Sequence, residues 1–335
     1  MSEHDAERTA QISSPIIKGV DSPADQDAVV LVMHYDAIQI GGAAAGCTGT
    51  LLAPRLVLTA RHCVAKTDES AACDSSGNPT FGGEIQGDHL PSKLYAFSGT
   101  TRPDFLRGLD KGARAAEIID DASKTLCNHD LALILLDRPL VGGKIAPVRL
   151  DGGPRKGDSV LVVGWGVTDK TSDPPVRQQR SGVKILTVGP ADALGPAEFR
   201  LGESGCAGDS GGPAFAEDTG AVLGVLSRGG NGGGSSPGDP EGCIGAENVF
   251  TSAASFKDLL VGAYAKAGQD PWIEGQPDPR TLPPKPPAAD APPEDAGCTI
   301  ARGAHGGRKT TSALAAAFAI AAAGIACFAR RRTRS

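Results

Sequence analysis

The sequence of 335 residues is short of several features that would place it in a simple class. Its eight cysteines are too few for a disulfide-dense mini-protein, although a reducing compartment usually requires fewer. Acidic residues outnumber basic ones, 39 to 33, and this argues against nucleic acid as a partner. The first 15 residues lack the apolar stretch of an export signal. Strands alternating with helices of 10–15 residues are also missing, so a doubly wound α/β fold is not expected.

What the sequence does contain indicates a folded chain of about two domains' length with many turns. Apolar residues make up 40% and charged residues 21%, and there are 45 Gly and 25 Pro. Short apolar or alternating runs broken by Gly, Pro and Asp predict an all-β barrel or sandwich, and the clearest cover residues 29–33, 50–59, 130–136, 159–165, 183–188 and 221–226. One helix is predicted over 252–267, with Gly268 as its stop.

The C-terminal part has a different composition. Nine prolines fall within residues 271–293, so we expect 269–297 to be a stiff, extended Pro-rich linker. Residues 310–329 are uncharged, long enough to cross a bilayer as one transmembrane helix, and followed by four arginines that would anchor it. Much of this stretch is Ala, so a soluble helix is the alternative. After Cys298 every charged side chain is basic, and the rest of the chain is correspondingly more acidic.

Three segments carry the residues of a nucleophilic hydrolase. Ser210 lies in Cys-Ala-Gly-Asp-Ser-Gly-Gly-Pro, and a Ser hydroxyl needs a base to become a nucleophile. It also needs backbone N–H groups aimed at the developing oxyanion, which flanking glycines allow. His62 follows Leu-Thr-Ala-Arg at the end of a predicted strand and precedes Cys63, and Asp130 begins the run Asp-Leu-Ala-Leu-Ile-Leu-Leu.

These segments resemble the catalytic blocks of the chymotrypsin-like (trypsin family) serine proteases, in the family's order His, Asp, Ser. The resemblance covers residues 16–268. It implies two six-stranded antiparallel β-barrels with a C-terminal helix. It also implies that Ser210 is the nucleophile, His62 the general base and then acid, and Asp130 the group that orients the imidazole. The oxyanion hole would be formed by the N–H groups of Gly208 and Ser210.

The N-terminal part of the resemblance concerns activation. Ile16 resembles the mature N-terminus of the family, whose ammonium would pair with Asp209. Residues 1–15 would then be a pro-segment, or else a truncated leader. Lys18 departs from the usual Gly, and Pro15 would block an ordinary trypsin-like activator, so the need for activation cleavage of such a zymogen stays open.

The resemblance also implies disulfides Cys47–Cys63 and Cys206–Cys243. Cys73 and Cys127 match no common bridge of the family and would pair by elimination. No His has metal-ligand spacing with Cys or carboxylates, so we expect no metal and no cofactor.

The pocket residues implied by the resemblance are Ser204, Ser227, Gly229 and Asn248. Ser204 would form an uncharged floor and Gly229 an open entrance, while Asn248 would narrow the slot. Ser227 belongs to the edge strand that pairs with substrate, where Arg228 replaces an aromatic residue. We therefore expect neutral residues, small to medium or apolar, before the scissile bond, unless Glu203 or Glu247 turns inward and adds a basic preference. The insertion 229–242 would be a loop that gates access, or a disordered surface insertion.

The tail resembles the C-terminal sorting tails of bacterial surface proteins, most closely the myxobacterial type. Residues 298–335 would form it, with Cys298 as the processed or lipid-modified residue. Such a tail requires export, so the true start would lie upstream, and a cytosolic enzyme is the alternative. The sequence thus predicts a monomeric serine endopeptidase for protein or peptide substrates, held at the cell surface by a membrane tail or released. A catalytically inactive, protease-like binding module is the other hypothesis.

Overall fold

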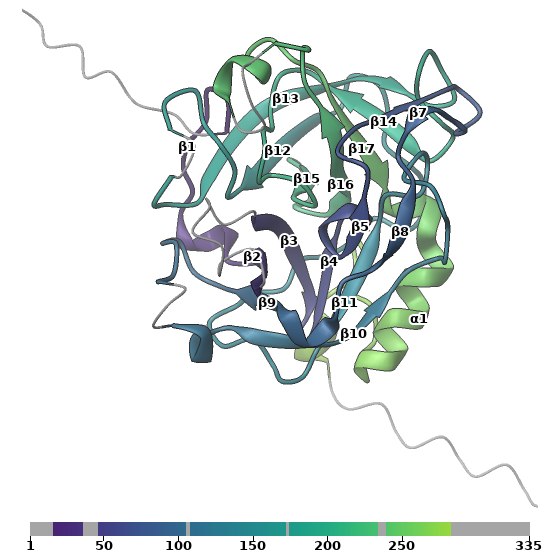
Figure 1. Cartoon of the computed structure of the whole chain (residues 1–335). Coiled ribbons are helices and arrows are strands. Elements are labelled where there is room, and N and C mark those ends of the chain that lie inside the picture. The colour runs from purple at the N-terminus through teal and green to yellow at the C-terminus, as the bar shows by residue number, and fades with distance from the viewer. Residues whose placement is uncertain (1–15, 36–45, 105–107, 172–173, 234–238, 283–335) are drawn as a thin grey trace, which may run out of the picture. The chain divides into compact units, whose positions relative to one another are not determined.

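The computed structural model describes residues 16–35, 46–104, 108–171, 174–233 and 239–282, all within one compact unit, Met1–Pro283 (Figure 1). The predicted span 310–329 and Cys298 lie outside these residues. In the part of the chain described, no helix combines the length and apolar character needed to cross a bilayer.

The first half of the unit is a closed barrel of six antiparallel strands. Their order is β10-β11-β4-β3-β2-β9, and the strands are β2 (Val29–His34), β3 (Gly46–Ala53), β4 (Leu56–Thr59), β9 (Leu94–Phe97), β10 (Ala113–Ile119) and β11 (Ala132–Leu136). Val30 and Val32 of β2 fill the barrel interior, while Val29 packs in the core shared with the second half. This strand is apolar on both faces because both faces are buried.

The second half is also a ring of six strands, closed by pairing between β13 and β14. It contains β12 (Ser159–Gly164), β13 (Gln178–Val188), β14 (Glu198–Leu201), β15 (Pro213–Ala216), β16 (Val222–Gly229) and β17 (Asn248–Ser252). The two predicted six-stranded barrels are therefore confirmed. A short strand that the sequence did not predict, β1 (Val20–Asp21), adds to β13 as a seventh strand.

Two small sheets stand outside the barrels. They are formed by β5 (Ala65–Thr67) with β8 (Ile85–Asp88), and by β6 (Ala71–Cys73) with β7 (Pro79–Gly82). Short 3₁₀ turns connect the strands; they are η1 (Ala24–Gln26), η3 (Arg61–Cys63), η4 (Pro91–Lys93), η5 (Leu109–Lys111), η6 (Pro240–Gly242), η7 (Ala253–Phe256) and η8 (Pro279–Thr281).

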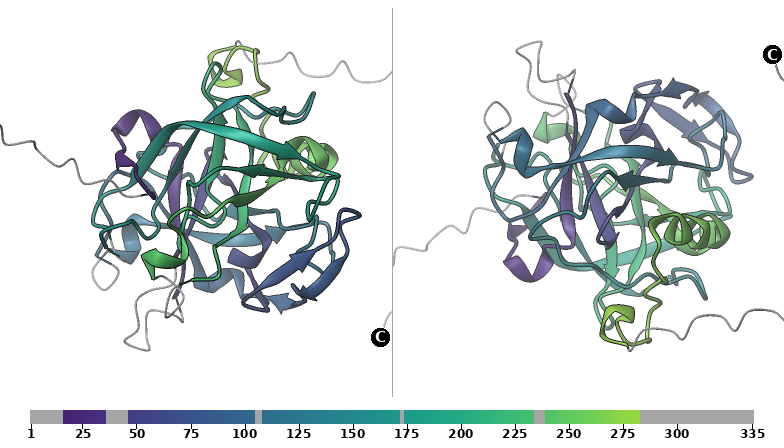
Figure 2. Two further views of the ribbon diagram at one scale, coloured as in Figure 1. Left: turned by 90° about the horizontal axis from the view of Figure 1, so that it is seen from above. Right: turned by 90° about the horizontal axis from the view of Figure 1, so that it is seen from below.

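The predicted helix is present as α1 (Lys257–Ala267), preceded by the 3₁₀ turn η7 in place of its first turn. Gly268 ends it in the left-handed conformation (φ 69°), which glycine adopts without strain. α1 lies against the outside of the barrels (Figure 2). Its Leu260 and Tyr264 belong to a core shared by both barrels.

The compact domain continues beyond 268, into the first part of the predicted linker. The amide of Val148 donates to the Trp272 carbonyl (2.9 Å), and Arg149 forms an ion pair with Glu274 (2.5 Å). Residues 269–282 therefore pack on the domain through a strand-like backbone pairing and an ion pair. The high proline content of this stretch did not indicate either contact.

Candidate active site

Strand pairing brings His62 and Asp130 together. β4 and β11 are antiparallel neighbours with Thr59 opposite Ala132, so the turn after β4 meets the residues just before β11. His62 lies in that turn, and its Nδ1 is 2.8 Å from Asp130 Oδ2. The backbone N–H of His62 also donates to Asp130 Oδ1 (3.0 Å). Two bonds to one carboxylate fix both the position and the tilt of the imidazole.

A third donor reaches Asp130 from the other barrel. Ser227 Oγ, on β16, donates to Asp130 Oδ2 at 2.7 Å. Burial alone would raise the pKa of Asp130, but the charge and hydrogen bonds of His62, with the Ser227 hydroxyl, outweigh burial and hold that pKa below its ordinary value. Burial lowers the pKa of His62, but the charge and hydrogen bond of Asp130 prevail and raise it.

Ser210 lies beside the turn that carries His62. Its carbonyl oxygen accepts from the Thr48 amide (2.8 Å) and is 3.5 Å from Cys63 Sγ. Gly211, the next residue, has a φ of +77° and sits so close to β4 that a Cβ there would be 2.1 Å from Thr59 Oγ1. Only glycine fits this position, and its contact holds the Ser210 segment against the residues just before His62.

The predicted oxyanion-hole donors lie in a turn held by Thr48. The Thr48 hydroxyl donates to the Gly208 carbonyl (2.9 Å), and Gly208 has a φ of +94°. Among the described residues, the N–H groups of Gly208 and Ser210 have no hydrogen-bond acceptor. Both N–H groups are therefore available to donate to a substrate oxyanion.

Asp209 is a second buried carboxylate, with only backbone donors. The amide of Gly166 donates to its Oδ1 (2.7 Å) and that of Cys206 to its Oδ2 (2.9 Å). Burial raises the pKa of Asp209 to about 7, because these two bonds and the charge of Arg102 compensate only in part. The predicted partner Ile16 is buried in the core of the second barrel, and in the described part of the chain no hydrogen bond or ion pair joins it to Asp209.

The segment after Ile16 is held in place although the chain is intact. Lys18 forms an ion pair with Glu203 (2.6 Å), and Arg180 donates to the Ile17 carbonyl (2.9 Å). Ile16 and Lys18 both have positive φ, 44° and 62°, which is unfavourable for these residue types. The N-terminal segment is therefore docked next to the Ser204 loop in a constrained conformation.

Three of the predicted pocket residues meet in one cluster, in which Ser204 and Asn248 are buried and Gly229 is exposed. Asn248 Oδ1 accepts from Ser204 Oγ (2.8 Å), from the Ser204 amide (3.0 Å) and from the Gly205 amide (2.9 Å). A Cβ on Gly229 would be 2.1 Å from Asn248 Nδ2, so the Asn248 amide fills the space beside Gly229. The Asn248 side chain thus accepts the hydrogen bond of the Ser204 hydroxyl and lies against Gly229.

The two glutamates that could have added a basic preference have other partners. Glu203 pairs with Lys18, as described above, and Glu247 is 3.3 Å from Arg200. Ser227, also predicted to bind substrate through its strand, donates its hydroxyl to Asp130. Ser227 lies beyond the last residue of β16 that pairs with β15, in the part of β16 that pairs only with β17. The insertion 229–242 is described only in part, and Asn231 ties its two ends by donating to the carbonyls of Glu241 and Ile244 (2.8 Å each).

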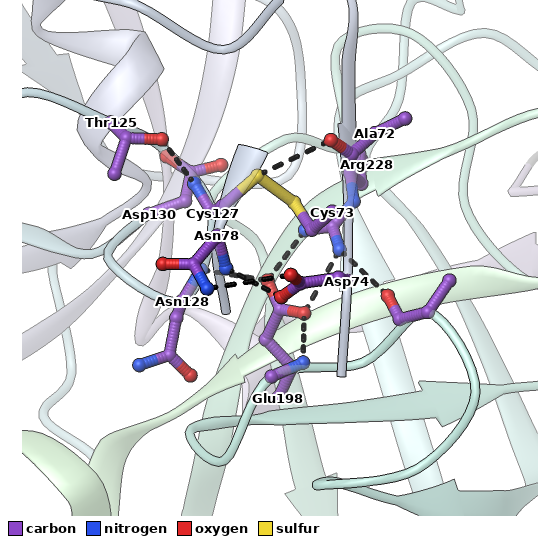
Figure 3. The surroundings of a disulfide bond; sticks show 12 residues. Ala72, Cys73, Asp74, Asn78, Thr125, Cys127, Asn128, Asp130, Glu198 and Arg228 are labelled. Carbon is purple, nitrogen blue, oxygen red and sulfur yellow. Dashed lines mark hydrogen bonds and ion pairs between the residues drawn. A yellow bond between two sulfur atoms is a disulfide. The ribbon is translucent and has the colours of Figure 1, made fainter. Parts of the chain in front are cut away.

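Three disulfides join the cysteine pairs expected from the sequence. Cys47–Cys63 and Cys206–Cys243 brace the His62 turn and the Ser210 loop, and Cys73–Cys127 links β6 to the residues before Asp130 (Figure 3). Cys47, His62 and Cys63 are the one group of described His, Cys, Asp or Glu residues close enough to hold a metal ion. Both sulfurs are consumed by the disulfide, so this group has only an imidazole to offer a metal.

Comparison with known proteins identifies the family of this chain. The family model for Trypsin matches residues 32–253. The chain belongs to the trypsin family. Beta-fibrinogenase mucrofibrase-1 of Protobothrops mucrosquamatus is 30% identical over 270 residues, covering 76% of this chain and 90% of that protein. Trypsin 5G1 of Aedes aegypti is 27% identical over 268 residues, covering 74% and 84%.

A solved structure extends the agreement to the fold. Neuropsin, a serine protease expressed in the limbic system of mouse brain, aligns with a TM-score of 0.51 at 19% identity, covering 74% of this chain and 99% of that one. Together these matches identify a trypsin-family serine protease domain.

Two arginines near the site of this trypsin-family chain form ion pairs that the sequence did not indicate. Arg61, next to His62, is buried and forms ion pairs with Asp88 and, at 3.6 Å, with Asp120. Arg228, at the position usually aromatic, pairs with the buried Glu198. Each partner lies 27 or more residues away along the chain. No local pattern around either arginine indicates its partner.

Proposed function

We propose that this chain is a serine endopeptidase that hydrolyses peptide bonds through an acyl-enzyme on Ser210. The observation that carries the proposal is the Ser227–Asp130–His62 hydrogen-bond chain at the junction of the barrels, with the Ser210 turn packed beside it. A buried, ionised carboxylate on Nδ1 leaves Nε2 of the imidazole free to accept a proton. This is the tautomer that a serine nucleophile needs.

The reaction proceeds in two halves. His62 accepts the Ser210 proton as Oγ attacks the carbonyl carbon, and the oxyanion forms hydrogen bonds with the N–H groups of Gly208 and Ser210. His62 then gives that proton to the leaving amine, the C–N bond breaks, and the acyl group stays on Oγ. Water attacks the acyl-enzyme, His62 takes its proton, and the acid product leaves as Ser210 recovers the proton. Asp130 stays ionised throughout and stabilises the imidazolium.

Substrate would bind along β16 and in the pocket beside it. The backbone of Ser227–Gly229, unpaired on its β15 side, suits strand addition by an extended peptide. The Asn248 amide beside Gly229 and the neutral Ser204 favour small or medium neutral side chains before the scissile bond. No free carboxylate of the described pocket residues is available to select Lys or Arg.

Activation would require cleavage before Ile16. The new ammonium would pair with Asp209, which in the intact chain has no cationic hydrogen-bond partner among the described residues. Sequencing the N-terminus of the active protein tests this. A terminus at Ile16 supports it, and full activity with an intact Met1 terminus contradicts it.

Export and surface attachment form the cellular part of the proposal. Three disulfides favour an oxidising compartment over the cytosol. The sorting tail 298–335, with Cys298 as its modified residue, rests on the sequence resemblance. Fractionation of cells expressing the full chain or Cys298→Ala tests it: loss of membrane association in the variant supports the tail, and equal association contradicts it.

The enzymatic proposal is tested with a randomised peptide library. Processed wild-type protein should cleave it with a preference for small neutral residues before the scissile bond, and Ser210→Ala should not. Cleavage by both proteins would assign the activity to another nucleophile. Cleavage by neither would favour the inactive binding module.

A further inference from the structure

Glu198, at the start of β14, is a buried carboxylate whose two oxygens accept four hydrogen bonds. Oε1 accepts from the Asn128 amide (3.0 Å) and Arg228 Nη1 (2.6 Å), and Oε2 accepts from the Gly195 amide (2.9 Å) and Arg228 Nη2 (2.9 Å). Its side chain has no exposed surface, and that of Arg228 is 18% exposed. A bidentate guanidinium and two amides compensate for the cost of burying the charge.

Glu198 joins two segments that reach Asp130 from different barrels. Asn128 lies two residues before Asp130 on the first barrel, and Arg228 directly follows Ser227 on the second. Ser227 donates to Asp130, so the path Asp130, Ser227, Arg228, Glu198, Asn128 and back to Asp130 is a closed ring. The ring spans both barrels with Asp130 as one of its members.

Asn128 is fixed by further contacts. Its φ is 68°, and its Oδ1 accepts from the Ala197 amide (2.6 Å). Gly77, in the turn between β6 and β7, lies so near that a Cβ there would be 2.7 Å from Asn128 Cβ. The preceding residue, Cys127, is disulfide-bonded to Cys73 (Figure 3). The segment before Asp130 is therefore held by the β6–β7 hairpin on one side and by Glu198 on the other.

We propose that Glu198 and Arg228 are positioning residues for Asp130, and through it for His62. The proposal rests on the function proposed above, because it concerns the group that orients the imidazole. Loss of either member leaves Asn128 or Ser227 without its brace, and Asp130 moves relative to His62. A displacement on the order of 1 Å at such a site typically lowers kcat/KM by about 100-fold.

The charged and titratable groups around the ring are few. Asp130 faces His62 and Ser227, and Glu198 faces Arg228. His129, between Asn128 and Asp130, is paired with Asp121 at 2.5 Å. The hydrogen bond to Asp121 raises the pKa of His129, and the charge of Glu198 adds a smaller increase. Arg61 adjoins His62 but is paired with Asp88 and Asp120.

The test is the titration of His62 by NMR, assigned with His62→Ala, in the wild type, Glu198→Gln and Arg228→Gln. If the ring positions Asp130, both variants lower the pKa of His62, because the bond that raises it weakens while burial stays. A direct effect of charge would instead shift the pKa of His62 in opposite directions, since Glu198→Gln removes a negative charge and Arg228→Gln removes a positive one. Shifts of opposite sign, or none in either variant, overturn the proposal.

Controls separate positioning from stability and from catalysis. Glu274→Gln removes the comparable Arg149–Glu274 pair elsewhere in the domain and should leave the pKa of His62 unchanged. Arg228→Gln keeps both backbone donors of Glu198, so it tests the ring even where Glu198→Gln does not fold. In the kinetic assay, kcat should fall about 10- to 100-fold with little change in KM. The NMR result needs no activity, so failure of the proposed function and failure of the ring are distinguishable.

Discussion

Two buried carboxylates flank the candidate nucleophile, and their surroundings differ in kind. Asp130 and Asp209 are 1% and 3% exposed. Asp130 receives two hydrogen bonds from His62 and one from Ser227, and its pKa is lowered. Asp209 receives two from backbone amides, and its pKa is raised to about 7. Burial is common to both, so the charge state is decided by the donors that each carboxylate meets.

The comparison assigns a different role to each region. The Asp130 region is complete in the intact chain and should determine the rate of the chemical step. The Asp209 region lacks a cationic partner among the described hydrogen-bond donors, and it adjoins the pocket through Cys206 and Gly205. It should determine activation and specificity.

The largest expected effect comes from removing the charge of Asp130. Asp130→Asn should lower kcat/KM by about 10⁴-fold, because an amide would favour the wrong tautomer of His62. The matched variant Ser227→Ala keeps the charge and should cost far less. Kinetics on a cleaved peptide measure both, and equal losses in the two variants would show that the charge is not the decisive feature.

The pH dependence of the same reaction follows from His62. The base must be neutral, so kcat/KM should rise with pH through a pKa above the ordinary value of 6.5. The free energy of unfolding should change in the opposite direction. Because the pKa of His62 is raised in the fold, the His62–Asp130 pair stabilises the fold at low pH, and this contribution is lost as the pH rises through that pKa. If kcat/KM instead rose with an apparent pKa below 6.5, the pairing of His62 with Asp130 would be contradicted.

Next in size are the disulfides of the two regions. Removing Cys73–Cys127, which closes a separation of 54 residues beside Asp130, should lower the free energy of unfolding by about 4 kcal/mol. Removing Cys206–Cys243, with a separation of 37, should cost nearly as much. Urea unfolding of the two double Cys→Ser variants compares them. We expect only the second to alter the cleavage profile, and an altered profile in the first would contradict the division of roles.

A smaller effect is expected in the pocket. Asn248→Gly empties the space beside Gly229 and removes the acceptor of Ser204, so larger apolar side chains should fit. The ratio of kcat/KM for Phe over Ala before the scissile bond should rise about 10- to 200-fold. Because both substrates are measured on one variant, folding yield cancels. An unchanged ratio would show that the Asn248 side chain does not limit the pocket.

The last prediction concerns the contribution of Asp209 to stability in the intact chain. Its pKa is higher in the folded than in the unfolded state, so the folded state binds the proton more tightly. Stability should therefore fall as pH rises from 3.8 to about 7 and level off above it. Asp209→Asn should remove this slope and raise Tm at pH 8, by about 2–4 °C per kcal/mol. Parallel Tm profiles for wild type and variant would contradict the assignment.

The sequence predicted the parts of the site that local motifs determine. His62, Asp130 and Ser210 each lie in a run whose apolar residues fix a strand or whose glycines fix a turn. Strand order then places the first two together, as Thr59 opposite Ala132 shows. The sequence resemblance also grouped Asn248 with Ser204 and Gly229, although it did not indicate the hydrogen bonds between Asn248 and Ser204.

The features that the sequence did not predict depend on register between distant strands. Glu198 meets Arg228 because β14 and β16 both flank β17, and nothing local in either segment indicates the partner. The same holds for β1, whose two residues pair with β13 more than 150 positions later. The docked stretch 269–282 was hidden by its proline content, since its contacts come from Trp272 and Glu274.

The central claim is that Ser210 is a nucleophile activated by the His62–Asp130 pair. Its most direct test is labelling of correctly processed protein with a fluorophosphonate probe, followed by mapping of the modified peptide. We predict a single adduct on Ser210 in the wild type, none in Ser210→Ala and very slow labelling in Asp130→Asn. Absence of labelling in the wild type, or an adduct that persists in Ser210→Ala, would contradict the claim.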